Sequence, residues 1–157
     1  MKQVKITSSD DLEIFGHLSL PQTREILYAL LIISGWIHGG IKLEDNSIDP
    51  LHLEVINYLN RRGCATLIVD KRGSKGYGKE YQDKIDFCGR EVDDIIAGHD
   101  FLRSLPDIKG KSISIHGTSR GATLAALVIS KSDIFKSAIL ASGFYDIQEQ
   151  YRFEEKN

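Results

Sequence analysis

The stretch from Lys111 to Lys131, KSISIHGTSRGATLAALVISK, most constrains what this chain can fold into. Its first part alternates apolar and polar residues, as a β-strand does, and its last part has the spacing of an amphipathic helix. Between them lies Gly117-Thr118-Ser119-Arg120-Gly121, a G-x-S-x-G sequence typical of a sharp turn from a strand into a helix. The stretch therefore predicts a strand, a tight turn and a helix, with Ser119 at the turn.

Ser119 is the candidate nucleophile of this turn. A serine hydroxyl attacks well only when it is exposed, positioned and next to a base. Such a turn strains the backbone at the serine, and Gly117 and Gly121 remove side chains that would collide where the strand and the helix cross. The N–H of Arg120, the residue after the nucleophile, is predicted to donate to the oxyanion. An ordinary glycine-bearing turn is the alternative, but the flanking strand and helix favour the nucleophile.

Composition narrows the class of protein. With 157 residues, 41% of them hydrophobic, the chain can bury one core, so residues 1–157 are expected to form a single domain. The net charge of -2, with both signs interspersed, argues against nucleic acid and favours a small substrate. Cys64 and Cys88 lack metal-ligand spacing, and the N-terminus lacks an apolar signal core, so a reduced, cytoplasmic protein is expected. The longest apolar run, Ile26–Ile33, is too short for a membrane span.

The remaining pattern predicts a mostly parallel sheet. Residues 3–7 and 12–20 alternate around four turn-formers and predict an antiparallel hairpin. Leu27–Ser34 and Cys64–Val69 are continuously apolar, as expected of central strands covered on both faces. The further predicted elements are a helix that starts at Asp49-Pro50 and ends at Gly63, with Leu53, Val55, Ile56 and Leu59 on its buried side, a helix over Glu91–Leu105, and a last strand over Phe135–Ala141.

The loop after the first central strand is where enzymes with such a serine turn place a second oxyanion donor. Here it reads Ser34-Gly35-Trp36-Ile37-His38-Gly39-Gly40. If the strand ends at Ser34, the N–H of Trp36 points inward. If the strand runs on, His38-Gly39-Gly40 supplies the donor. We favour Trp36.

Two other features offer weaker chemistry. Asp70 to Gly78 is glycine-rich and follows a buried strand, but it lacks the G-K-[ST] ending of a phosphate-binding loop, so no nucleotide site is predicted. His38 is expected to organise its loop or face solvent, and His99 is expected to be packed rather than catalytic.

Four segments together resemble the prolyl oligopeptidase-like serine hydrolases and peptidases, which have the α/β-hydrolase fold. The segments are VDKRGSKGYGKEY (69–81), GREVDDIIAGHDFLRS (89–104), SISIHGTSRGATLAA (112–126) and FKSAILASGFYD (135–146). The resemblance implies an α/β three-layer sandwich and a Ser-His-Asp triad acting on peptide or ester carbonyls. It also implies Ser119 as the nucleophile, with neither a metal nor an organic cofactor.

The chain departs from the family pattern after the serine. In this fold the triad acid and then the histidine follow the nucleophile. The aspartates after Ser119 are Asp133 and Asp146, and Asp146 is the weak candidate for the acid. All the histidines precede the serine, namely His17, His38, His52, His99 and His116. The carboxyl-terminal third of the domain is therefore expected to be absent.

Three hypotheses account for this departure: a fragment of a serine hydrolase, a short protein completed by a partner chain, or a non-catalytic remnant used for binding. The fragment is favoured. Without its base the chain alone should be nearly inactive. An uncovered edge strand would also favour pairing between copies, so self-association through a sheet edge is expected.

Overall fold

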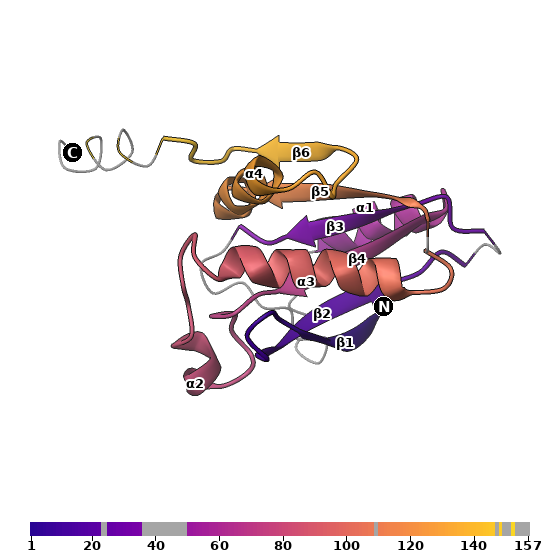
Figure 1. Cartoon of the computed structure of the whole chain (residues 1–157). Coiled ribbons are helices and arrows are strands. Elements are labelled where there is room, and N and C mark those ends of the chain that lie inside the picture. The colour runs from indigo at the N-terminus through magenta and orange to yellow at the C-terminus, as the bar shows by residue number, and fades with distance from the viewer. Residues whose placement is uncertain (23–24, 36–49, 109, 147, 149–151, 153–157) are drawn as a thin grey trace.

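The computed structural model describes residues 1–22, 25–35, 50–108, 110–146, 148 and 152. Within them, six strands form one sheet in the order β1-β2-β4-β3-β5-β6. Strand β2 is antiparallel to β1 and β4, and the other pairs are parallel, which confirms the predicted mostly parallel sheet with an N-terminal hairpin (Figure 1). The strands are β1 (Lys2–Thr7), β2 (Glu13–Ser19), β3 (Tyr28–Ile33), β4 (Cys64–Asp70), β5 (Ser112–Thr118) and β6 (Ala138–Ala141).

The core lies along the middle of the sheet. Leu31 of β3 is in register with Leu67 of β4 and Ile115 of β5, and all three side chains are fully buried. Side chains alternate across a strand, so these residues share one face of the sheet. The continuously apolar runs that predicted central strands therefore lie where burial on both faces is greatest.

Helices cover both faces and make three layers. They are α1 (Pro50–Asn60), α2 (Lys79–Gln82), α3 (Glu91–Ser104) and α4 (Arg120–Lys131). Helices α3 and α4 pack against one another on one face, and α1 lies on the other (Figure 1). In α3, a Cβ on Gly98 would lie 2.7 Å from the Val69 side chain, so this glycine lets the helix approach β4 closely.

The structure corrects the predicted inner face of α1. Leu53 and Val55 are 36% and 48% exposed, whereas Ile56 and Asn60 are buried. Helix α1 contacts β4 rather than the whole sheet, so only a narrow stripe of it is covered. Asn60 accepts from the Ser19 hydroxyl at 2.5 Å and donates to the Cys64 carbonyl at 2.8 Å, which ties the helix end to two strands.

Two further elements differ from the prediction. The last strand begins at Ala138 rather than Phe135. The Phe135 ring packs edge-on against His99, with centroids 5.0 Å apart. The short helix α2 was not predicted, since its four residues carry no periodic pattern.

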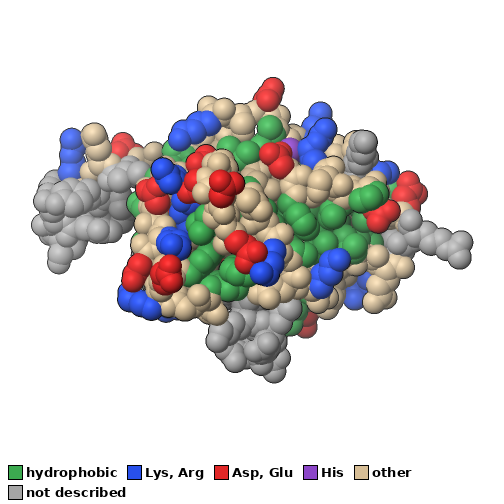
Figure 2. Space-filling view, turned by 60° about the horizontal axis from the view of Figure 1, so that its bottom comes forward, with side chains coloured by type: hydrophobic (Ala, Val, Ile, Leu, Met, Phe, Trp, Pro, Cys, Tyr) green, Lys and Arg blue, Asp and Glu red, His purple; other side chains and the backbone are tan. Residues whose placement is uncertain are grey.

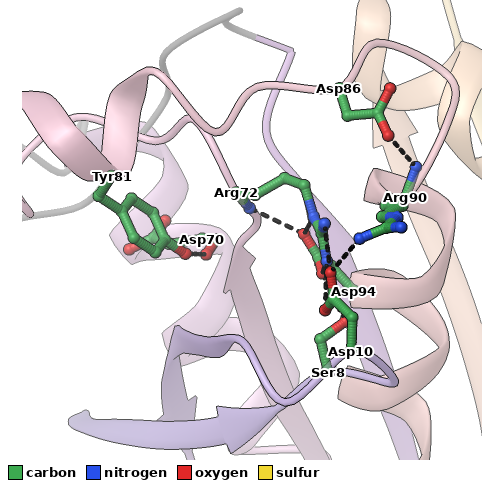
Figure 3. A network of polar contacts seen from close by, with 8 residues as sticks. All are labelled: Ser8, Asp10, Asp70, Arg72, Tyr81, Asp86, Arg90 and Asp94. Carbon is green, nitrogen blue, oxygen red and sulfur yellow. Dashed lines mark hydrogen bonds and ion pairs between the residues drawn. The ribbon is translucent and has the colours of Figure 1, made fainter.

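A buried arginine fixes the N-terminal hairpin to α3. The Arg72 side chain donates to both carboxylate oxygens of Asp94, at 2.7 and 2.9 Å, and to Asp10 at 3.0 Å (Figure 3). Arg90 donates to Asp10 as well, at 3.0 Å. The hydrogen bond from Arg72 is the main reason that the pKa of Asp10 lies well below its ordinary value. The start of the glycine-rich segment is thus held to the hairpin and to α3 by charged side chains.

Charged side chains of both signs alternate over the surface seen in Figure 2, without a large area of one sign. None of the helices that the structure describes is both long enough and apolar enough to cross a membrane.

Candidate active site

Ser119 lies between the end of β5 and the start of α4, at the strand-to-helix turn that the sequence predicts. Its backbone has φ 54° and ψ -124°, a conformation that side-chain-bearing residues rarely adopt. The Ser119 N–H donates to the Ala141 carbonyl at 2.8 Å, and the Ser119 carbonyl accepts from Ala122 at 2.9 Å. The turn is therefore strained and is held from β6 and from the first turn of α4.

The flanking glycines are required by close backbone contacts. A Cβ on Gly117 would lie 2.2 Å from the Gly121 carbonyl oxygen, and a Cβ on Gly121 would lie 2.4 Å from the Ile33 carbonyl oxygen. Both distances are far below van der Waals contact, so neither position accepts a larger residue. The sequence argument for these two glycines is confirmed.

The loop after β3 begins beside the serine. A Cβ on Gly35 would lie 2.5 Å from the Thr118 carbonyl oxygen and 3.0 Å from the Ser119 Cβ. Gly35 therefore packs directly against the turn, next in the chain to Trp36. Trp36 and Gly39, the two candidates for the second oxyanion donor, lie outside the described residues, so both registers stay predictions.

The Arg120 side chain turns inward. It is 5% exposed, and its Nη2 donates to both carboxylate oxygens of Glu91, at 2.7 and 2.6 Å. The Phe87 ring lies over the guanidinium, with its centroid 4.5 Å from Cζ. The Arg120 backbone N–H belongs to the first turn of α4, where N–H groups have no partner within the helix. Its side chain thus anchors the helix start, while its N–H remains the predicted oxyanion donor.

Lys71 lies beside this ion pair and is 1% exposed. Burial is the main reason that its pKa is lowered from 10.5 to about 8, while the negative charge of Glu91 opposes that shift. Burial also raises the pKa of Glu91, against the hydrogen bond from Arg120 and the charge of Lys71. Sequence reasoning missed this cluster, because the residues lie on three separate segments and each reads as an ordinary surface charge.

Two of the described histidines, His17 and His99, are engaged with other partners than Ser119. His17 is fully buried, and its Nε2 lies 2.8 Å from Asp70 Oδ2. Strand β2 lies three strand spacings from β5, which is about 14 Å. His99 is 3% exposed and its Nδ1 lies 3.0 Å from the Asp100 carboxylate, so its predicted packed role is confirmed.

The structure tests the remaining histidines less directly. His116 belongs to β5, as predicted, and is half-buried there. His38 lies outside the described residues, and the side chain of His52 is outside them too.

The Asp70 carboxylate is occupied elsewhere. It accepts from the Tyr77 hydroxyl at 2.6 Å as well as contacting His17. The Asp70 carbonyl accepts from the Tyr81 hydroxyl at 3.0 Å (Figure 3). The Tyr77 and Phe15 rings stack over this cluster with centroids 4.0 Å apart. The cluster fastens the glycine-rich segment to β2, away from the serine turn.

The two aspartates that follow Ser119, of which Asp146 is the predicted acid candidate, lie toward opposite ends of α4. Asp133 is exposed and follows the carboxyl end of this helix. It therefore lies about 20 Å from Ser119 along the helix axis. Asp146 follows β6, whose carboxyl end lies at the same sheet edge as Ser119 because β5 and β6 are parallel. Asp146 is exposed as well. Of the two, Asp146 is on the side of the sheet edge where the serine lies.

Among the residues that the structure describes, no group of three or more His, Cys, Asp or Glu side chains gathers closely enough to hold a metal ion. The site therefore consists of a strained serine, a helix start, a glycine-led loop and a buried ion pair.

A mainly parallel sheet covered on both faces, with a serine between two obligatory glycines at a strand-to-helix turn, is the architecture of the α/β-hydrolase fold. Within that fold the chain belongs to the prolyl oligopeptidase family of serine peptidases, whose profile matches residues 52–156, more than half of the chain.

Individual relatives agree with this assignment. The uncharacterised peptidase YuxL of Bacillus subtilis (strain 168) is 24% identical over 160 residues, which span 88% of this chain and 24% of YuxL. An acylaminoacyl peptidase solved in complex with Z-Gly-Gly-Phe-chloromethyl ketone has a TM-score of 0.78 at 24% identity, over 97% of this chain and 24% of that one.

A puromycin-hydrolysing peptidase of Mycobacterium tuberculosis has a TM-score of 0.81 at 20% identity, over 94% of this chain and 23% of that one. At these identities the solved structures establish the shared fold. The chain spans about a quarter of the length of these relatives.

Proposed function

We propose that this chain carries the nucleophile of a serine hydrolase that cleaves peptide or ester bonds through an acyl-enzyme on Ser119. The observation that carries the proposal is the strained backbone of Ser119, with φ 54° and ψ -124°, between two glycines that cannot bear a Cβ. Strain of this kind persists only where surrounding structure enforces it, and it clusters at functional sites. The proposed reaction uses neither a metal nor an organic cofactor.

In the proposed reaction, Ser119 Oγ attacks the carbonyl carbon of the substrate and loses its proton to a base. The carbonyl oxygen becomes an oxyanion, which accepts hydrogen bonds from the N–H of Arg120 and from that of Trp36, or of Gly39 in the other register. Collapse of the tetrahedral intermediate expels the amine or alcohol, and water then releases the acyl group.

The general base is the missing part of this scheme. The family order requires a histidine after the nucleophile, and every histidine of this chain precedes Ser119. A serine site without its histidine retains only a residual fraction of its rate. We therefore expect acylation by this chain alone to be slow, and Asp146 remains the candidate acid.

A fluorophosphonate probe tests the proposal, since it reacts covalently with activated serines. Ser119→Ala should abolish the labelling. Ser142→Ala is the matched control, because Ser142 also has a positive φ of 54° and follows the neighbouring parallel strand. Labelling should survive that change. Labelling of the folded wild type that is no faster than that of Ser119→Ala, after an exposure long enough for a serine without its histidine to react, would contradict the proposal.

The second candidate function is a non-catalytic module that binds or self-associates. It is favoured by β6, an edge strand whose Ile139 side chain is 57% exposed. Exposed edges pair readily with other strands, including those of a second copy. Sedimentation of the wild type and of Ile139→Lys tests this idea. A monomeric wild type would exclude self-association, and turnover of a short acyl ester would exclude a purely non-catalytic role.

A further inference from the structure

Three charged side chains from three elements meet behind the serine turn. Lys71 follows β4, Glu91 opens α3 and Arg120 opens α4, and they are 1%, 0% and 5% exposed. The Arg120 Nη2 lies 2.7 and 2.6 Å from the two oxygens of Glu91. Charged groups this deeply buried are uncommon unless they are paired. The cluster is therefore a specific, buried set of paired charges at the sheet edge where Ser119 lies.

Stability alone is a weak reason for such a pair. Removing two charges from water is unfavourable, and well-packed apolar side chains of similar volume often serve a fold equally well or better. The Glu91–Arg120 pair fixes an orientation. Both Glu91 oxygens accept hydrogen bonds from one guanidinium nitrogen, which restricts where the Arg120 side chain lies. The restricted residue is the one that immediately follows Ser119.

We propose that Glu91 is a positioning residue, which acts through Arg120 to hold the first turn of α4 so that the Arg120 N–H points at the oxyanion site. This inference rests on the proposed role of Ser119. Glu91 is the first residue of α3, and α3 packs against α4, so the ion pair joins the starts of two neighbouring helices. The Phe87 ring over the guanidinium confines it from another direction.

Lys71 has a supporting role in this arrangement. Burial favours the neutral form of Glu91, and the positive charge of Lys71 opposes this by favouring the carboxylate. An ionised Glu91 is needed for a charge-assisted bond to Arg120. The groups that act on Lys71 are Glu91 and Asp94 of α3, Arg120 of α4 and Asp70 of its own segment.

The experiment compares two variants that differ only in the ion pair. Lys71→Met is the reference, in which the hydrogen bond from Arg120 still favours the ionised form of Glu91. The second variant adds Glu91→Leu and Arg120→Met, which remove both members of the pair together and leave none of the three charges buried alone. Replacement by apolar residues should preserve the fold, which the urea midpoint checks. The labelling rate of Ser119 by the fluorophosphonate should fall at least 10-fold in the triple variant. A purely structural pair would leave the rate unchanged once the fold is intact.

A second readout does not depend on serine reactivity. The Ser119 N–H donates to the Ala141 carbonyl of β6 at 2.8 Å, and the Ala122 N–H donates to the Ser119 carbonyl at 2.9 Å. Their hydrogen exchange should speed up at least 10-fold in the triple variant, while the N–H of Ile115, bonded to the Ser137 carbonyl at 3.0 Å, should be unaffected. If the triple variant does not fold, the double variant Lys71→Met/Glu91→Gln replaces it, and it is compared with Lys71→Met in both measurements.

The outcomes separate the two proposals. If the wild type is labelled and the triple variant matches the reference in labelling and exchange, the positioning role of Glu91 is wrong and the proposed function stands. If the wild type is not labelled, the proposed function fails, and exchange alone decides whether the pair holds the turn. Faster exchange at Ser119 and Ala122 then supports the inference, and unchanged exchange overturns it.

Discussion

Replacing Lys71 by methionine should stabilise the folded protein, by an amount that falls as the pH rises. Lys71 is 1% exposed, and its pKa is lowered from 10.5 to about 8, chiefly by burial. Each unit of pKa difference corresponds to about 1.4 kcal/mol, so keeping this ammonium buried disfavours the fold by roughly 3 kcal/mol at pH 7. Methionine has a similar length and no charge, and removes that penalty.

The sign of the pH dependence follows from the proton count. Between pH 8 and 10.5 the unfolded chain holds the Lys71 proton and the folded chain has released it, so the wild type gains stability as the pH rises. The advantage of Lys71→Met should therefore shrink from about 3 kcal/mol at pH 7 to about 1 kcal/mol at pH 9.5.

Urea unfolding of both proteins at the two pH values measures this difference. Burial raises the pKa of the Cys64 thiol from 9.0 to about 11, which lowers the stability of both proteins above pH 9 and cancels in the comparison. Lys75→Met is the control, since Lys75 is exposed and its loss should change the free energy of unfolding by under about 0.5 kcal/mol at pH 7. An equal advantage at both pH values, or a less stable Lys71→Met at pH 7, would refute the reasoning.

Three further substitutions, one of them with a matched comparison, test contacts of the fold by urea unfolding. Asn60→Ala removes the hydrogen bonds that join α1 to two strands and should lower the free energy of unfolding by about 1–3 kcal/mol, and a neutral result would contradict the burial of that amide. Gly117→Ala puts a Cβ 2.2 Å from a backbone oxygen and should lower it by about 3 kcal/mol or more, whereas Gly110→Ala, at φ 80° with open space around it, should lower it by about 1 kcal/mol. Equal losses in the two would show that crowding at Gly117 costs no more than the backbone strain at Gly110, and would contradict this reasoning. Tyr77→Phe keeps the stacked ring but removes the donor to Asp70, so a loss of about 1–3 kcal/mol is expected, and no loss would mean that this bond adds nothing.

The elements that could be predicted are those in which the residue types of the element itself indicate its burial or its backbone conformation. The apolar run ending at Ile33 and the alternation around Ile115 mark strands by burial alone, and the glycines around Ser119 mark a turn that other residues cannot adopt. The start of β6 was misplaced at Phe135, because an apolar side chain packed against a helix looks the same in a sequence as one in a strand.

The part of the site that could not be predicted consists of contacts between distant segments. Glu91 and Arg120 lie 29 residues apart, and the periodic pattern of α3 would put a glutamate at its start in solvent. Lys71 has charged neighbours in the sequence, so the local sequence pattern does not indicate that it is buried. Pairing across the fold decides these positions, and single-sequence patterns report only local preference.

The hydrogen bond from the Ser119 N–H to the Ala141 carbonyl connects the nucleophile turn to the outermost strand of the sheet. Edge strands open more readily than central ones, since they are held by hydrogen bonds on one side only. Opening of β6 would therefore break one of the hydrogen bonds that hold the serine turn. Any strand that pairs with β6, from this chain or another, would slow that opening and prolong the reactive conformation.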